Sequence, residues 1–178
     1  MGELLGSPPS EWTLTTVTEG ERPLLLQLFE HYLYDFSKME HADLDEDGRF
    51  VPPARPFVER YWTAPGRHAL LLRVGGKPAG FVLVDERSPL EGGRDDHYIG
   101  AFFVTRAYRR RGHGVAMARA VFDRFPGRWQ ILEIARNPAA QTFWRRLIGE
   151  YVGGRYTERW LNEREVIQEF DTRDKVTP

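Results

Sequence analysis

The sequence contains no cysteine, and this absence excludes several kinds of chemistry at once. Disulfide bonds, cysteine nucleophiles, iron–sulfur clusters and zinc sites with cysteine ligands are all ruled out. The five histidines show no spacing typical of a metal site, so we expect no metal. A chain without cysteine also fits a cytosolic setting.

Neither sign of charge is in clear excess, because 25 Lys and Arg residues face 26 Asp and Glu residues. A near-neutral total provides no general attraction to nucleic acid or to a membrane surface. No apolar run approaches the roughly 20 residues that span a bilayer, and the first twelve residues lack the features of a signal peptide. We therefore expect a cytoplasmic protein with no nucleic-acid or membrane partner.

The composition is that of a folded protein, since 41% of the 178 residues are hydrophobic. This length suits one domain, which we expect over residues 1–178 with flexible tails at about 1–10 and 171–178. Alternation and helical spacing of apolar residues predict the elements. Strands are expected at 12–18, 68–74, 79–85, 97–104, 129–135, 155–160 and 165–170, and helices at 21–37, 56–63, 112–125 and 138–148. This order predicts one central sheet with helices on its faces.

The most informative segment is 98–118, where an apolar strand leads into a basic, glycine-containing turn and then a helix. Amides in the first helical turn have no partner inside the helix, and the helix dipole adds positive potential there. Glycine lets a phosphate approach the main chain, and arginine attracts it. The turn therefore predicts a pyrophosphate site, carried by Arg109, Arg110, Arg111, Gly112 and Gly114.

Two common phosphate motifs do not fit this turn. The chain has no Gly-x-x-x-x-Gly-Lys-Ser/Thr string, and Met117 stands where a dinucleotide fingerprint requires its third glycine. Taken alone, the turn could also be a basic surface feature, or a nucleic-acid contact, although the acidic total disfavours the latter.

A second strand–helix unit, 129–151, follows the turn. Asn137 stands at the start of its helix as a candidate cap, and Ala140, Phe143 and Trp144 follow on the helix. This unit could hold the rest of an extended ligand. The alternative is an ordinary amphipathic helix whose aromatic residues belong to the core.

Together the two segments resemble the GNAT acetyltransferase superfamily, most clearly over about residues 97–151. The family signature Arg/Gln-x-x-Gly-x-Gly/Ala corresponds to Arg109, Gly112 and Gly114. The family pattern Asn-x-x-Ala followed by an aromatic pair corresponds to Asn137, Ala140, Phe143 and Trp144. The resemblance implies an α/β (α+β) fold, with a single mixed, mostly antiparallel central sheet of about six to seven strands flanked by helices.

The resemblance also implies acetyl-CoA as co-substrate. Amides of Arg110–Val115 would bind its pyrophosphate, the strand end Phe102–Val104 would pair with the pantetheine arm, and the Val104 N–H would polarise the thioester carbonyl. Asn137 would contact the pantetheine arm. The cofactor-binding residues are then Phe102, Phe103, Val104, Arg109, Arg110, Arg111, Gly112, His113, Gly114, Val115, Asn137, Ala140, Phe143 and Trp144.

The implied reaction is direct attack on the thioester by a primary amine of a small molecule or peptide; a homodimer is left open. A lysine-like amine has a pKa of about 10.4, so freeing it at pH 7 costs about 4.6 kcal/mol and a general base is expected. Glu133 is the first candidate, because some family members carry a catalytic glutamate in a string like Leu132-Glu133-Ile134. His97, which opens the strand before the turn, is the second.

The sequence departs from the family at Trp144, where many members place a tyrosine that protonates the leaving thiolate. An indole N–H is not a usable acid. Tyr151, seven residues on, is the candidate acid, unless the thiolate takes its proton from water. This departure keeps open a second function, an acyl-CoA-binding sensor or regulatory module without turnover.

Overall fold

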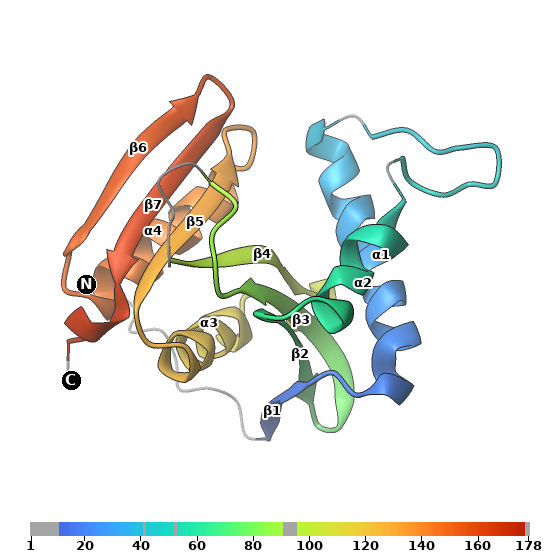
Figure 1. The fold of residues 1–178 in the computed structure, drawn as a ribbon, viewed down its shortest axis with the longest axis horizontal. Helices are drawn as coiled ribbons and strands as arrows, with labels where there is room; N and C mark the ends of the chain where they lie inside the picture. The colour runs from blue at the N-terminus through green and yellow to red at the C-terminus, as the bar shows by residue number, and fades with distance from the viewer. Residues whose placement is uncertain (1–10, 41, 52, 91–95, 177–178) are drawn as a thin grey trace. The chain divides into compact units, whose positions relative to one another are not determined.

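The computed structural model describes residues 11–40, 42–51, 53–90 and 96–176 (Figure 1). Within these ranges the elements are β1 (Trp12–Thr16), α1 (Arg22–Glu40), α2 (Ala54–Thr63), β2 (Arg67–Val74), β3 (Lys77–Asp85), β4 (His97–Val104), α3 (His113–Arg124), β5 (Arg128–Ile134), α4 (Pro138–Tyr151), β6 (Tyr156–Asn162) and β7 (Glu165–Asp171). Short 3₁₀ helices lie at Glu19–Glu21 (η1), Arg106–Tyr108 (η2) and Thr172–Asp174 (η3).

The seven described strands form one sheet in the order β1-β2-β3-β4-β5-β7-β6. Strands β1–β2, β5–β7 and β6–β7 pair antiparallel, whereas β4 and β5 pair parallel. This mixed sheet with its four helices confirms the predicted fold class. None of the helices in the described ranges is long and apolar enough to cross a membrane.

The chain divides into two compact units. The first consists of the residues up to Leu83 together with Ala101–Ala116, and the second of Val84–Gly100 together with the residues from Met117 onward. The expected single domain over residues 1–178 stays a prediction.

The core of the first unit joins α1, α2 and the β2–β3 hairpin to the end of β4. Its buried side chains include Leu25, Val58, Leu71, Phe81 and Phe103. Helix α2 begins at Ala54, two residues earlier than predicted. Pro56 does not start the helix but lies in its first turn, where a missing N–H costs no hydrogen bond.

The β2–β3 hairpin is tighter than predicted, because its loop is only Gly75 and Gly76. Both have positive φ, 54° and 74°, which is the geometry of a two-residue turn that glycine adopts without strain. Lys77 and Pro78 therefore belong to β3 instead of to the loop.

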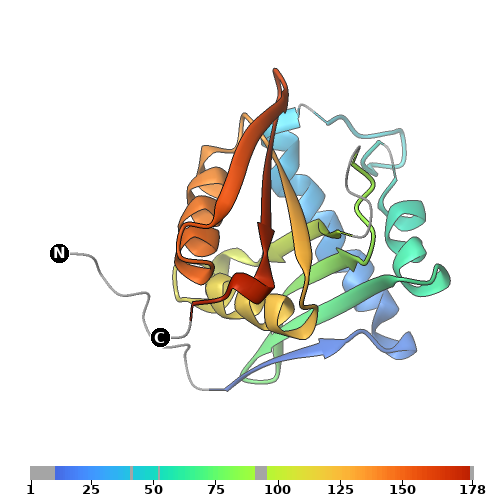
Figure 2. The ribbon, with the colours of Figure 1, turned by 60° about the vertical axis from the view of Figure 1, so that its left-hand side comes forward.

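The second unit is built around Phe122 of α3. Its ring contacts Trp129 of β5 at 5.2 Å, Tyr151 of α4 at 5.3 Å and Phe170 of β7 at 5.0 Å between centroids. Strands β7 and β6 run side by side as a long ribbon next to β5 (Figure 2).

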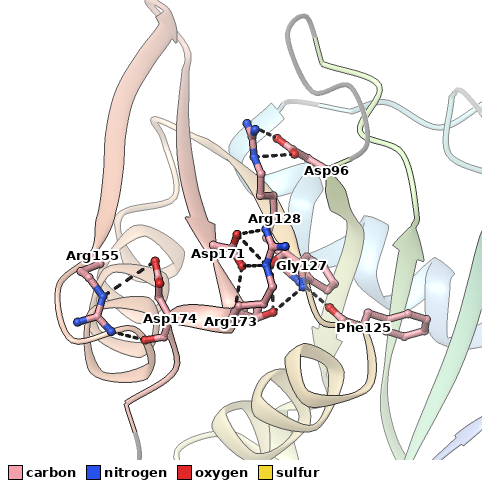
Figure 3. A network of polar contacts seen from close by, with 10 residues as sticks. Asp96, Phe125, Gly127, Arg128, Arg155, Asp171, Arg173 and Asp174 are labelled. Atoms are coloured by element: carbon pink, nitrogen blue, oxygen red, sulfur yellow. Dashed lines mark hydrogen bonds and ion pairs between the residues drawn. The ribbon is translucent and has the colours of Figure 1, made fainter.

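The end of β7 and the residues that follow it make polar contacts within the second unit. Asp171, expected in a tail, is the last residue of β7, and its carboxylate accepts from Arg173 (Figure 3). Asp174 pairs with Arg155 at 4.0 Å, and the Val176 amide donates to the Tyr151 carbonyl at 2.9 Å. Residues 1–10 and 177–178 lie outside the described residues, so the flexibility of both tails stays a prediction.

Candidate active site

The basic turn before α3 has an unusual main chain. Arg110 has φ 58° and Gly112 has φ 80°, so two left-handed residues flank Arg111. Left-handed geometry costs a non-glycine residue roughly 1–2 kcal/mol, and such strain is typical of functional sites. Successive amides in such a turn form a concave anion-binding nest.

The head of α3 adds further donors to this nest. The first α-helical hydrogen bond runs from the Ala116 amide to the Gly112 carbonyl at 3.0 Å. The amides of His113, Gly114 and Val115 therefore have no partner within the helix. Three to four main-chain donors and the positive end of the helix dipole thus coincide in one short segment.

The Arg109 side chain holds the turn to the strand end. Its Nε donates to the Val104 carbonyl at 2.6 Å, its guanidinium pairs with Asp35 of α1, and it lies over the Phe103 ring at 5.4 Å. Arg106 also pairs with Asp35, at 2.8 Å. Because these contacts engage Arg109, the main chain becomes the stronger candidate for phosphate binding, with Arg110 and Arg111 exposed beside it.

Asp35 is ionised in this arrangement. Burial opposes its charge, but hydrogen bonds from Arg109 and Arg106 outweigh burial and hold the pKa of the carboxyl below its usual value. Asp35 thus brings two arginines of the turn against α1.

His113 is neutral at the head of α3. It is 2% exposed and stands edge-on to Tyr108 at 5.8 Å. Burial, followed by the charge of Arg111, lowers its pKa. Among the described residues its Nδ1 has no hydrogen-bond partner.

The β4–β5 ladder is short. It pairs His97 with Trp129 and Tyr98 with Gln130, and is not continued at Ile99 and Gly100. At the end of β4, Phe103 and Val104 are buried and Phe102 is half-buried.

The corner between β5 and α4 is closed by two side chains. Asn137 caps the helix, as predicted, because its Oδ1 accepts from the Ala140 amide at 3.1 Å. Gln141 Nε2 donates to the carbonyls of Ile134 and Ala135, at 3.1 and 3.2 Å. Phe143 is half-buried on α4. These bonds hold Asn137 in a defined place after β5.

Glu133 is a buried carboxyl near the end of β5. It is 5% exposed, and neither of its oxygens has a hydrogen-bond partner among the described residues. Burial and then the negative charge of Glu158 raise the pKa of Glu133 to about 8, against an opposing effect of Arg145. At neutral pH most molecules therefore carry a protonated Glu133.

A family model described as "Acetyltransferase (GNAT) family" matches residues 26–149, which include the turn before α3 and the Asn137 corner. The chain belongs to the GNAT acetyltransferase family. It is therefore an acyltransferase of a family that uses acetyl-CoA and acts on amine acceptors.

Solved structures show the same fold at low sequence identity. An acetyltransferase from Thermus thermophilus is 16% identical, with a TM-score of 0.64 over 90% of this chain and 96% of its own. The Vibrio cholerae spermidine N-acetyltransferase in complex with CoA and spermine is 10% identical, with a TM-score of 0.62 over 93% and 98%. The Escherichia coli ribosomal-protein-S18-alanine N-acetyltransferase is 15% identical, with a TM-score of 0.58 over 91% and 94%. No curated protein matches the chain by sequence.

Two catalytic candidates of this GNAT acetyltransferase, His97 and Tyr151, make contacts that bear on their roles. His97 packs against Trp129 at 5.0 Å and Phe125 at 6.0 Å, at the end of β4 opposite to Val104. Tyr151 is 2% exposed, and its hydroxyl donates to Asp123 Oδ1 at 2.6 Å. Burial, followed by Asp123, raises the pKa of Tyr151, which makes it a weaker acid.

Trp144 belongs to the aromatic core of the second unit. It is buried and packs against Phe122 at 6.4 Å and against Phe143 at 4.9 Å. These surroundings favour packing roles for Trp144, His97 and Tyr151, and their functional roles stay predictions. In the described ranges, no three His, Asp or Glu side chains are gathered as metal ligands would be.

Several residues at the site were not predicted from the sequence. Asp35 lies 74 positions from Arg109, and no local pattern connects them. Gln141 follows Asn137 by four positions, one helical turn, and that spacing was a usable signal. The polar residues near Glu133 come from three different elements, Arg145 from α4, Glu158 from β6 and Gln168 from β7.

Proposed function

We propose that this protein transfers an acetyl group from acetyl-CoA to a primary amine of a small molecule or a peptide. The observation that most supports this is the left-handed pair Arg110 and Gly112 in front of α3, a main-chain cradle suited to a diphosphate. A Cβ at Gly112 would be strained at φ 80°, which explains why glycine stands there.

Within the first unit, the main chain of Phe102–Val104 would pair with the pantetheine arm, and the Val104 N–H would donate to the thioester oxygen. Within the second unit, Asn137 would donate from Nδ2, since its Oδ1 caps α4. The amine nitrogen forms a bond to the acetyl carbon while the carbon–sulfur bond breaks, and the thiolate takes a proton from water.

Glu133 is the proposed acceptor of the amine proton, acting through water because its oxygens are buried. A base with a pKa near the working pH combines a useful ionised fraction with sufficient basicity. Cytoplasmic location and a homodimer remain proposals of the same kind.

Calorimetry with acetyl-CoA tests the cradle through two variants. Arg110→Gly keeps the left-handed main chain and should weaken binding less than about 10-fold, the share of one exposed charge. Gly112→Val should weaken it by about 100-fold or more, because a β-branched residue disfavours φ 80°. If Arg110→Gly abolishes binding and Gly112→Val does not, the side chain and not the main chain holds the phosphate.

Thiol release with a panel of amines then tests transfer. The panel includes spermidine, because one named neighbour is a spermidine N-acetyltransferase, and an alanine peptide, because another is a ribosomal-protein-S18-alanine N-acetyltransferase, together with neutral amines. The second candidate function, acyl-CoA binding without turnover, is favoured by the buried Trp144 and the engaged Tyr151 hydroxyl. Tight binding without thiol release from any amine would select it.

A further inference from the structure

Glu133 shares one sheet face with two polar residues of the neighbouring strands. In the β5–β7 ladder Ile131 lies opposite Gln168 and Glu133 opposite Val166, and in the β6–β7 ladder Glu158 lies opposite Gln168. Paired residues point to the same face and faces alternate along a strand. Glu133, Gln168 and Glu158 therefore form a diagonal across three strands.

The diagonal contains buried oxygen atoms without a donor. Gln168 is fully buried, and its Nε2 donates to Glu158 Oε2 at 2.8 Å. Its Oε1 has no partner among the described residues, and the same holds for both Glu133 oxygens. Diagonal neighbours lie roughly 7–8 Å apart at Cα, within reach of long side chains. When Glu133 is protonated, its O–H is thus a donor for a hydrogen bond that Gln168 Oε1 can accept.

Helix α4 contributes the cation of this face. Arg145 makes two bonds to Glu158, from Nε to Oε2 and from Nη2 to Oε1, both 2.8 Å. Its Nη2 also contacts Gln141 Oε1 at 3.4 Å, and Gln141 holds the end of β5. Polar contacts thus run from the partly exposed Arg145–Glu158 pair to the buried Gln168.

We propose that Gln168, Glu158 and Arg145 are positioning residues for Glu133, with Gln168 orienting its carboxyl and the Arg145–Glu158 pair setting its charge. This inference deepens the proposed function and rests on Glu133 as its base. Gln168, Glu158 and Arg145 act on the reaction only through Glu133.

The two charged members act on Glu133 in opposite senses. Besides burial, Glu158 from β6 raises the pKa of Glu133 and Arg145 from α4 lowers it, while β7 contributes the neutral Gln168. Removing one member of the pair leaves the other uncompensated. Glu158→Gln should therefore favour ionised Glu133, and Arg145→Gln should favour the protonated form.

The experiment is the pH profile of kcat/KM for thiol release, with a saturating amine, in Glu158→Gln and Arg145→Gln. The apparent pKa of the ascending, low-pH limb should fall by about one unit in Glu158→Gln and rise by about one unit in Arg145→Gln. The matched control is Arg146→Gln, the next arginine on α4, which pairs with Glu150 at 3.0 Å and should leave the profile unchanged.

Gln168→Leu tests the orienting role. It should lower kcat while leaving the KM for acetyl-CoA within about twofold, because Gln168 has no part in the predicted cofactor contacts. Gln168→Glu restores a polar oxygen but adds a negative charge. Its pH profile should therefore move to higher pH and not return to that of the parent.

Loss of the ion pair as a merely structural event would affect Arg145→Gln and Glu158→Gln alike. Shifts of the same direction in both, or no shift in either, overturn the proposal. Titration of the Glu133 carboxyl by ¹³C NMR supplies the same opposed shifts without turnover. If those shifts are present while no amine is acetylated, the positioning of Glu133 by these residues is supported and the proposed function is contradicted.

Discussion

A buried carboxyl holds its proton more tightly than an exposed one, and Glu133 combines burial with a nearby negative charge from Glu158. Its pKa is 4.5 in an unfolded chain and about 8 in the folded protein. Between pH 4.5 and about 8, Glu133 therefore keeps its proton in the folded state and loses it in the unfolded state. The associated stability is complete below about 4.5 and is lost as the pH rises through 8.

Glu133→Gln should therefore change stability in a pH-dependent way. Glutamine resembles the protonated carboxyl, so the variant and the parent should have similar unfolding free energies at pH 5. At pH 9 the variant should be more stable by a few kcal/mol, at about 1.36 kcal/mol per pKa unit. Urea unfolding at both pH values measures this. A variant that is less stable at pH 9 contradicts a raised pKa.

The same substitution should remove the proposed base, so that kcat/KM falls by about 10²–10⁴-fold. Activity of the parent should rise with pH through about 8, where half of Glu133 is ionised, and level off above that pH. A flat profile in the parent, or an active Glu133→Gln, would assign the carboxyl to structure alone.

Tyr151→Phe separates packing from proton transfer. The hydroxyl bonds to Asp123, which also accepts from Lys175 at 2.7 Å. Its loss should cost about 1–2 kcal/mol of unfolding free energy, while kcat changes less than threefold. A fall in kcat of about 100-fold, with the protein still folded, would instead restore Tyr151 as the acid.

At the scale of elements, Asn137 at the start of α4 caps the helix and is also proposed to contact the ligand. Oδ1 of Asn137 caps the helix, and the proposed ligand contact uses Nδ2 of the same amide. Gln141 fastens this helix start to the end of β5. In the proposed function this corner, held by side chains one helical turn apart, would support a ligand contact.

Substitutions at Asn137 should distinguish the two functions. Asn137→Ala removes both and should cost about 1 kcal/mol of stability together with acetyl-CoA affinity. Asn137→Ser keeps a capping oxygen, so stability should be nearly unchanged while affinity still falls about 3–10-fold, the share of one hydrogen bond. Thermal unfolding and calorimetry measure the two effects. Equal affinity in the serine variant and the parent would remove Asn137 from the binding site.

At the scale of the whole molecule, a ligand that binds only the folded state must stabilise it. Acetyl-CoA at 100 times its Kd should add about 2.7 kcal/mol to the free energy of unfolding. Gly112→Val should lose this gain at the same ligand concentration, and Arg146→Gln should retain it. No stabilisation of the parent by acetyl-CoA or CoA would contradict the cofactor assignment.

The elements near the site were largely predictable. The bounds of β4 agree at both ends, and Asn137 caps α4 as expected. Local spacing decides such features, because strand alternation and helix caps depend on residues that are near in the chain. The start of α2 and the length of the β2–β3 loop were wrong by two residues, since proline and glycine each allow more than one register in a turn.

The sequence by itself determined the family and the position of the turn proposed to bind phosphate, because glycine, arginine and helix signals lie within a few residues of one another. Only the tertiary structure decided what the polar side chains do there. Arg109 is bound to Asp35, the Tyr151 hydroxyl to Asp123, and Glu133 is buried beside Glu158. These partners come from distant parts of the chain, and burial, which sets the pKa of Glu133, exists only once the sheet and helices have packed.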